Sequence, residues 1–354
     1  MAAVAGGVRD GFNDVLDGDG GMPRLPGHRA PWLAAMQNAF GHRVIVLRAE
    51  MAHDRSDSAR RTAARVTGVL PLMLVRGPIF GKFLVSLPYV NTGGLWAADN
   101  TSADALIDAA CELADQLDVK QLELRHEQPH QHPRFNLSKT QKVHMRMALP
   151  PTGDDMMASL KSKVRSQVKK SLREPFSVHI GRQNLLSDFY DVFAVNMRDL
   201  GTPVFAKRLF MEILDSFGDD AEIVVLRDGD QPIAGALLVH DGATTEVPSA
   251  SCLRHFNRRN ANMAMYWHLI THAIDRGSTT FDFGRSSRDS GTFRFKKQWG
   301  AQPSPAHWQY YVRRGDPEAM RPDSDGNRRL IEIWKRLPVG LTRIIGPPIV
   351  RGIP

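Results

Sequence analysis

The sequence predicts an α/β (α+β) fold: two domains in tandem, each a mixed, largely antiparallel sheet flanked by helices. Its 354 residues, 42% hydrophobic and 24% charged, suit a folded chain and allow about two domains of roughly 100 to 200 residues each. Segments with apolar residues at helical spacing alternate along the chain with β-branched apolar segments. The same order of segments occurs twice, which favours two related domains.

The first half has two predicted helices and five predicted strands. The helices are residues 30–40 and residues 103–117, the second capped by Thr101 or Ser102. The strands are apolar or alternating runs between Gly, Pro or polar turns, at residues 42–51, 64–76, 82–90, 119–127 and 143–150. Before all of these, residues 1–25 are rich in Gly and Asp and are expected to form a disordered leader.

The second half begins with a strongly basic helix over residues 159–173, which stops before Pro175. Three further helices are predicted at residues 188–200, 205–217 and 261–275. Strands are predicted at residues 176–182, 221–241 (two strands), 244–252, 279–284, 292–299 and 307–314. We therefore expect domains at residues 26–152 and 153–315, followed by a C-terminal helix and Pro-rich tail over residues 316–354.

A short repeat supports duplication of the two halves. Val66–Leu70 (VTGVL) matches Ile233–Leu237 (IAGAL), and each lies on a strand that is followed by a strand, a helix and an alternating strand. The alternative is that any two α/β segments share this order, because only two matched glycines support the alignment. The repeat favours duplication over coincidence.

Charge and cysteine usage limit the functional classes. The 46 Lys and Arg against 38 Asp and Glu give a net charge of +8, which favours anionic partners such as nucleic acid, phosphorylated sugars or a bilayer surface. Only two cysteines are present, so a disulfide framework is excluded and a reducing, cytoplasmic location is expected. The N-terminus does not read as a signal peptide, and no apolar run is long enough for a transmembrane helix.

Common catalytic and metal-binding motifs are missing from the sequence. There is no Walker loop, no Gly-x-Ser-x-Gly elbow and no Gly-x-Gly-x-x-Gly fingerprint. His126, His130 and His132 lie near prolines without a spaced third ligand, so no metal site is expected. Cys111 and Cys252 are expected to be packing residues.

Polar residues are densest in residues 281–291 (FDFGRSSRDSG), which are followed by residues 293–300 (FRFKKQWG). These segments resemble the C-terminal motif of the FemAB-like acyltransferases, especially the branch associated with exosortase and exopolysaccharide loci. Further matches within residues 30–354 are GVLPLMLV, GKFLVSLPYVNTGG, LELR, KVRSQVKKS, LGTPVF and GPPIVRG. The resemblance implies two GNAT-like domains in tandem. In the better-known members, aminoacyl groups pass from aminoacyl-tRNA to a peptidoglycan precursor, whereas donor and acceptor in the exopolysaccharide branch are generally unassigned.

The resemblance also implies a catalytic lysine. Members keep a Phe-Lys pair whose lysine lies at the acyl-transfer site, and this pair maps to Phe295 and Lys296. The chemistry gives an independent reason, because acyl transfer to an amine passes through an anionic tetrahedral intermediate that a fixed cation stabilises. The alternative for Lys296 is a solvated strand lysine. On a regular strand, Lys297 would face the opposite way.

Three further candidates for substrate binding lie in the same motif. Asp282 and Arg285 flank Gly284 at the predicted end of a strand, where a small residue lets a substrate approach the backbone. They are either substrate contacts or an ion pair with one another. Trp299 is either a core residue or a platform for the face of a sugar.

Candidates for substrate binding also lie outside this motif. Arg165 and Lys169 are four residues apart on one face of the basic helix, where two cations can hold a diphosphate or a tRNA backbone; a solvated face is the alternative. Asn196 and Arg198, ahead of LGTPVF, are either substrate contacts or residues that cap or brace a helix.

The acyl donor is left open between aminoacyl-tRNA and acyl-CoA, and no tightly bound cofactor is expected. GNAT enzymes that use acyl-CoA hold its pyrophosphate with an Arg/Gln-x-x-Gly-x-Gly/Ala turn at a helix N-terminus. Residues 259–264 read RNANMA, so Asn262 replaces the key glycine and its side chain obstructs close approach of the phosphates. This replacement argues against acyl-CoA.

The sequence thus predicts an N-acyltransferase for a cell-envelope or exopolysaccharide precursor, an anionic small molecule or glycan, in a cleft between the halves. Lys296 would stabilise the oxyanion, and Arg285, Arg165 and Lys169 would position anionic groups. The alternative is a non-catalytic protein whose basic cleft binds a polysaccharide or nucleic acid. A third interpretation is peripheral contact with a membrane surface through the basic, Pro-rich residues 334–354.

Overall fold

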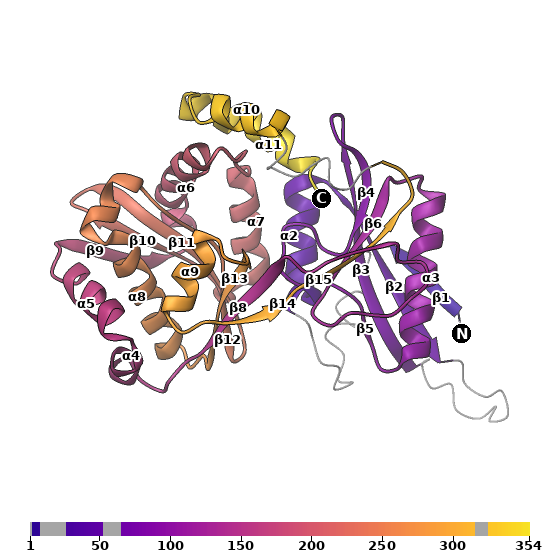
Figure 1. The fold of residues 1–354 in the computed structure, drawn as a ribbon, viewed down its shortest axis with the longest axis horizontal. Coiled ribbons are helices and arrows are strands. Elements are labelled where there is room, and N and C mark those ends of the chain that lie inside the picture. Colours follow the sequence, from indigo (N-terminus) through magenta and orange to yellow (C-terminus); the bar gives the residue numbers. More distant parts are fainter. Residues whose placement is uncertain (1, 8–25, 52–64, 316–324) are drawn as a thin grey trace. The chain divides into compact units, whose positions relative to one another are not determined.

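The computed structural model describes residues 2–7, 26–51, 65–315 and 325–354. The chain divides into two compact units, Met1–Thr140 with Ala306–Ala319 and Arg351–Pro354, and Gln141–Pro305 with Met320–Val350. Each unit contains one mixed sheet with helices packed against it (Figure 1). The predicted α/β class with largely antiparallel sheets is therefore confirmed.

The first unit is built on a sheet of strand order β1-β2-β3-β4-β6-β15-β7, with β5 paired to β3. Its strands are β1 (Ala2–Gly7), β2 (Arg43–Met51), β3 (Arg65–Gly77), β4 (Gly81–Val85), β5 (Trp96–Ala97), β6 (Gln121–His126), β7 (Leu137–Lys139) and β15 (His307–Val312). Its helices are η1 (Pro26–His28), α2 (Ala30–Phe40) and α3 (Asn100–Gln116). The N-cap of α3 is Asp99, not Thr101 or Ser102, because the Asp99 carboxylate accepts a hydrogen bond from Ser102 N (2.7 Å).

Residues 2–7 correct the expected leader. They form β1, which pairs antiparallel with β2 from Ala2↔Glu50 to Gly7↔Ile45. The segment AAVAGG has no apolar alternation, so only its pairing with β2 identifies it as a strand. The rest of the expected leader, residues 1 and 8–25, lies outside the described residues.

The second unit is built on a sheet of strand order β14-β8-β13-β12-β11-β10-β9. Its strands are β8 (Lys142–Ala148), β9 (Phe176–Gly181), β10 (Ala221–Asp228), β11 (Gln231–Asp241), β12 (Thr244–Cys252), β13 (Thr280–Ser287) and β14 (Gln302–Pro305). Its α-helices are α4 (Gly153–Ser159), α5 (Ser162–Ser171), α6 (Leu186–Leu200), α7 (Lys207–Phe217), α8 (Ala261–Asp275), α9 (Gly291–Gln298), α10 (Asp325–Trp334) and α11 (Val339–Arg351). Short 3-10 turns lie at η2 (Gln183–Leu185), η3 (Gly218–Asp220) and η4 (Arg254–Arg259).

The two sheets share one topology, as the repeat predicted. In each, three antiparallel strands (β2-β3-β4 and β10-β11-β12) lead through a helix (α3 and α8) to a strand that pairs parallel with the third (β6 and β13). The matched glycines lie on β3 and β11, where a helix approaches the sheet. A Cβ at Gly68 would lie 2.8 Å from Leu106 Cδ1 of α3, and one at Gly235 would lie 3.2 Å from Phe189 Cδ2 of α6.

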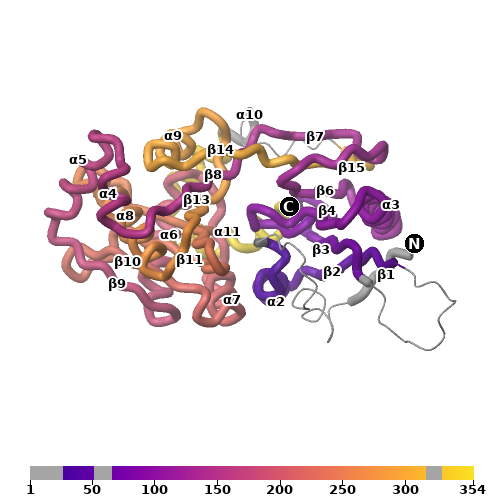
Figure 2. The backbone as a smooth tube through the Cα atoms, turned by 90° about the horizontal axis from the view of Figure 1, so that it is seen from below, coloured from indigo at the N-terminus to yellow at the C-terminus, as the bar shows by residue number. Residues whose placement is uncertain are grey.

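In each sheet, one strand comes from the part of the chain that otherwise forms the other unit. Strand β8 follows β7 in the chain but pairs with β13 and β14 in the second sheet, and β15 follows β14 but pairs with β6 and β7 in the first. Figure 2 shows the chain passing from β14 in one sheet into β15 in the other. We had expected residues 143–150 to complete the first half and residues 307–314 to lie in the second. Within the described residues, the chain consequently passes from one compact unit to the other at Thr140/Gln141, at Pro305/Ala306 and at Val350/Arg351.

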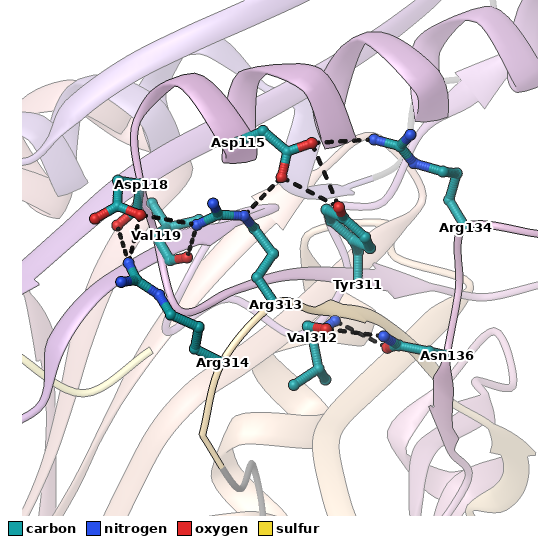
Figure 3. Close-up of polar contacts among 9 residues, drawn as sticks. All are labelled: Asp115, Asp118, Val119, Arg134, Asn136, Tyr311, Val312, Arg313 and Arg314. Atoms are coloured by element: carbon teal, nitrogen blue, oxygen red, sulfur yellow. Dashed lines mark hydrogen bonds and ion pairs between the residues drawn. The ribbon is translucent and has the colours of Figure 1, made fainter.

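A polar network fastens β15 and the residues after it to the end of α3 (Figure 3). Asp115 accepts hydrogen bonds from Arg313 Nε (2.6 Å), Tyr311 Oη (3.1 Å) and Arg134 Nη2 (3.2 Å). Arg313 also donates to Val119 O (2.6 Å). The returning strand is thus held by charged contacts as well as by its backbone pairing with β6.

Three predicted elements differ from the structure. Residues 291–298 are helix α9 rather than a strand, because Ser290 caps a helix by accepting a hydrogen bond from Phe293 N (3.1 Å). The basic helix, predicted over residues 159–173, is α5 and begins only at Ser162, because Leu160 is extended (φ −64°, ψ 139°); the residues before Leu160 form a separate helix, α4. The Pro-rich tail is helical, with two prolines inside α11. Among the described residues, no helix has the length and apolarity needed to cross a bilayer.

Candidate active site

Strands β12 and β13 pair in parallel only at their beginnings and then diverge. Their register runs from Thr244↔Thr280 to Glu246↔Asp282 and ends there. On the other side, the pairing of β13 with β8 is irregular between Asp282 and Arg285. The residues that follow Asp282 are therefore no longer paired with β12.

Asp282 braces this divergence. Its side chain is buried (4% exposed); one carboxylate oxygen accepts a hydrogen bond from Gly284 N (2.7 Å), and the other accepts one from Arg146 Nε of β8 (2.8 Å). Gly284 has a φ of +72°, a conformation that favours glycine. Asp282 is thus in an ion pair, but its partner is Arg146 rather than Arg285.

Lys296 is buried on α9 beside the end of β13. Its side chain is 9% exposed, and Nζ donates a hydrogen bond to Arg285 O (2.8 Å). Burial lowers the pKa of Lys296 from 10.5 to about 8; the Asp282 carboxylate opposes this lowering and the Arg285 guanidinium adds to it. At pH 7 roughly nine of ten molecules still carry the charge. The residue is therefore a desolvated ammonium, and the solvated strand lysine is wrong.

The other residues of the motif take different positions. Arg285 is half-buried and lies opposite His144 of β8. Phe295 packs edge-on against the ring of Tyr266 from α8, with 4.9 Å between ring centroids. Trp299 is 2% exposed and belongs to the core of the second unit, so it offers no open face to a sugar. Lys297, next to Lys296, is exposed.

The two cations of the basic helix do not act as a pair. Arg165 Nη2 donates to Ala158 O (2.9 Å) and Leu160 O (2.8 Å), and so caps the end of α4. Lys169 is exposed on α5. Of the two, Lys169 is the one directed to solvent.

Asn196 and Arg198 brace α6, the structural option given for them above. Asn196 Nδ2 donates to Ser251 Oγ of β12 (3.1 Å). Arg198 Nε donates to Asp199 (2.6 Å), and its Nη1 donates to Leu337 O (3.2 Å), which ties α6 to the C-terminal helices. These contacts assign the two side chains a positioning role within the second unit.

Comparison with known proteins places this site in a defined domain. Residues 158–297 match the family model for an acetyltransferase (GNAT) domain. These residues form a GNAT acyltransferase domain. The matched segment begins before α5 and ends at Lys297. It therefore includes Lys296 and the diverging strands β12 and β13.

Solved structures share the architecture of the whole chain. FemX is 14% identical, covers 95% of this chain and 100% of its own, and superposes with a TM-score of 0.61. A tandem GNAT protein from the clavulanic acid biosynthesis pathway is 12% identical, with coverage of 87% and 97% and a TM-score of 0.52. L-PGS from Bacillus licheniformis is 14% identical, with coverage of 79% and 86% and a TM-score of 0.50. At these identities the likeness shows the tandem GNAT fold. None of the curated proteins compared by sequence matches the chain.

The segment before α8 of the GNAT domain has its arginine already engaged. Arg259 donates from Nε to Glu174 (2.6 Å) and from its terminal nitrogens to Asp228. Asn260 adopts a left-handed conformation (φ +55°), and Asn262 stands at the second position of the helix. The arginine of the expected pyrophosphate turn is thus paired with two carboxylates, which adds to the argument from Asn262.

Sequence reasoning missed Arg146 and a histidine cluster. Arg146 meets Asp282 only because β8 joins the second sheet, which no local pattern reveals. Glu222 Oε2 accepts hydrogen bonds from Nε2 of His240 (3.0 Å) and His272 (2.6 Å), and Arg276 Nη1 lies 3.6 Å from the same oxygen. Burial would raise the pKa of Glu222, but these donors hold it well below its usual value. The arginine supplies positive charge to this carboxylate, so we interpret the cluster as a network joining β10, β11 and α8.

Proposed function

We propose that this protein is an N-acyltransferase that transfers an acyl or aminoacyl group to an amine of a cell-envelope or exopolysaccharide precursor. One observation carries the proposal: Lys296 is a desolvated ammonium where β12 and β13 diverge, within the residues that match the acyltransferase family. A fixed cation in a water-poor site is one element by which a protein can stabilise the oxyanion that forms in this reaction.

The reaction assigns one step to Lys296. The neutral substrate amine attacks the donor carbonyl, so that an N–C bond forms and the carbonyl oxygen becomes an oxyanion. The Lys296 ammonium stabilises that oxyanion, because burial removes the water that would screen the charge. Collapse of the intermediate breaks the bond to the donor's leaving group, and the proton released by the amine passes to the leaving group or to solvent.

Further roles follow from exposure. We assign Arg285, half-buried at the end of β13, to contact with an anionic part of the donor or acceptor. Lys169 is exposed on α5 beside other exposed cations and suits a polyanionic donor such as aminoacyl-tRNA. Phe295 and Asp282 support the site indirectly. Phe295 packs against the ring of Tyr266, and Asp282 accepts a hydrogen bond from the backbone N–H of Gly284.

For the donor, we propose aminoacyl-tRNA rather than acyl-CoA. Arg259 is occupied by Glu174 and Asp228, and Asn262 stands where a glycine would let a pyrophosphate approach. We expect free CoA to leave transfer unaffected at concentrations that inhibit CoA-dependent enzymes. A competitive effect of CoA on the initial rate would reverse this choice of donor.

Mass spectrometry of acceptor mixtures tests the function. The full chain is incubated with cell-envelope and exopolysaccharide precursors and with either aminoacyl-tRNA or acyl-CoA, and products are searched for an added acyl mass. We expect transfer by the wild type and a loss of roughly 100-fold or more in Lys296→Ala, the order found when a transition-state donor is removed. Lys297→Ala, a change in the exposed neighbour on the same helix, is the matched control.

The same experiment addresses the non-catalytic alternative. A protein that only binds a polysaccharide or nucleic acid retains its ligand and yields no product of increased mass. Transfer that survives Lys296→Ala undiminished would remove Lys296 from the mechanism.

A further inference from the structure

The C-terminal helices α10 and α11 use one side to pack on the second unit. Ile331 of α10 lies against Gly201, where an added Cβ would come within 2.4 Å of Ile331 Cγ2. Gly346 of α11 lies against Val204, with 2.8 Å between an added Cβ and Val204 N. Figure 1 shows the two helices running beside α6. Ile331 is half-buried and Gly346 is buried, so these positions mark the sides of α10 and α11 that contact the second unit.

Both helices also carry exposed apolar side chains. Leu330 and Ile333 on α10 are 64% and 59% exposed, and Leu341 and Ile344 on α11 are 42% and 72% exposed. Each pair is spaced three residues apart, as expected for neighbours on one helical face. Among the described residues, ten large apolar side chains are exposed, and these two short helices contribute four of them. We call these four side chains the apolar stripe.

The same segment is strongly basic. Residues 325–354 contain six Lys and Arg and two acidic residues, a net charge of 6 − 2 = +4, which is half of the +8 of the whole chain. Arg329 and Arg336 line one shallow hollow on α10 together with Ile333 and Glu332, whose carboxylate accepts a hydrogen bond from Lys335 Nζ (2.6 Å). Two guanidinium groups beside an apolar side chain suit a phosphate that is attached to a hydrocarbon.

A bilayer with anionic lipids fits both properties. A second copy of the chain could cover the apolar stripe, but it would bring two clusters of net charge +4 together. A nucleic acid would match the positive charge, but its phosphate backbone offers no apolar surface that would bury four exposed Leu and Ile side chains. Amphipathic helices with cations beside an apolar face lie in the interface of membranes, attracted by anionic headgroups.

We propose that α10 and α11 dock this protein on the surface of anionic membranes, with the apolar stripe at the acyl-chain boundary and Arg329 and Arg336 on lipid phosphates. The inference goes beyond the acyltransferase proposal and holds whether or not the chain proves catalytic. Combined with that proposal, it implies an acceptor that is itself attached to a lipid, because the enzyme would then share a surface with its substrate.

Vesicle co-flotation of the full chain tests the proposal. The vesicles are phosphatidylcholine alone, or equimolar phosphatidylcholine and phosphatidylglycerol. We expect binding to the anionic vesicles, weak binding to the neutral ones, and a decrease with salt. The double variant Ile333→Gln and Ile344→Gln should lower the partition coefficient by roughly tenfold or more, since it removes one exposed apolar side chain from each helix. Arg329→Gln with Arg336→Gln should reduce the preference for anionic vesicles.

Matched controls separate docking from folding and from catalysis. Ile79→Gln and Met211→Gln alter side chains that are 67% and 39% exposed elsewhere, and they should leave vesicle binding unchanged. All substituted side chains are exposed, so the unfolding temperature should not move. Transfer to a soluble acceptor should persist in the stripe variants, which distinguishes failure of docking from failure of the acyltransferase proposal.

Four results would overturn the proposal. One is no binding to anionic vesicles. Another is equal loss of binding in the Ile79 and Met211 controls. The third is a dimer, measured by light scattering, that the stripe variants convert to a monomer while vesicle binding is nil; that result would identify the stripe as a contact between copies. Binding of tRNA that depends on Arg329 and Arg336, without vesicle binding, would likewise assign the segment to nucleic acid.

Discussion

Replacing Lys296 by methionine tests two effects of this side chain separately: its effect on the free energy of unfolding and its effect on acyl transfer. Burial lowers the pKa of Lys296 from 10.5 to about 8, so the folded protein holds this proton less tightly than the unfolded chain does. The charged residue therefore destabilises the fold, and this penalty, about 3 kcal/mol, is fully present below the folded pKa. It disappears as the pH rises from about 8 toward 10.5, where the unfolded chain also loses the proton.

The methionine variant has no such titration. It also loses the hydrogen bond to Arg285 O, which leaves a carbonyl without its donor at a cost of about 1 to 3 kcal/mol. At pH 7 the net effect of the substitution is therefore a gain in stability of about 0 to 2 kcal/mol. The two effects differ in their pH dependence, however, because the penalty in the wild type falls by about 2 kcal/mol between pH 7 and about pH 9.5. The wild type should gain that amount relative to Lys296→Met over this interval.

Denaturant unfolding at the two pH values measures the effect. The free energy of unfolding is compared for the wild type, Lys296→Met and Lys297→Met; the last is the control, since Lys297 is exposed on the same helix. A difference between wild type and Lys296→Met that stays constant with pH would refute the buried ammonium. At pH 7, where Lys296 of the wild type is charged, acyl transfer should be lost in Lys296→Met.

Three further predictions concern other parts of the argument. Transfer by the wild type should decline above about pH 8 as Lys296 loses its proton. In Lys296→Arg the decline should move beyond about pH 10, because arginine stays charged. If the pH at which the rate declines is the same in both proteins, the titrating group is not Lys296. Asp115→Ala should lower the free energy of unfolding by about 1 kcal/mol through loss of its contacts to β15 and its neighbours, whereas Glu112→Ala on the same helix should not, in denaturant titrations. Gly284→Ala should cost about 1 kcal/mol or more because φ is +72°, and should lower transfer with it; equal stability would show that the turn tolerates a side chain.

Local patterns identified most of the elements and the residue on which the proposed function depends. The helix over residues 261–275 agrees with α8 end for end, because its apolar residues keep helical spacing over four turns. Lys296 was found through its motif, and its chemistry through the charge of the intermediate. The prediction failed where it relied on alternation alone: FRFKK alternates like a strand, yet the cap at Ser290 makes it a helix.

Long-range pairing accounts for the remaining differences. Residues 142–148 have the pattern of a strand, but nothing local says which sheet they join, so Arg146 was not recognised as the partner of Asp282. The same holds for Arg165, whose spacing from Lys169 suggested a paired cation site although its guanidinium is held by carbonyls of α4. Sequence spacing shows on which face of a helix or strand a side chain lies. Only the tertiary structure shows which groups that side chain is hydrogen-bonded to.

The placement of β8 in the second sheet and of β15 in the first affects how this protein folds and unfolds. A fragment that ended before β15 would leave the first sheet with a missing inner strand between β6 and β7, and one that began after β8 would open a similar gap between β13 and β14. Neither half is a self-sufficient folding unit, because exposed strand edges of this kind recruit other chains. We expect the two lobes to melt in a single cooperative transition. Two ancestral copies that traded strands as a domain-swapped dimer, later joined into one gene, would produce this connectivity.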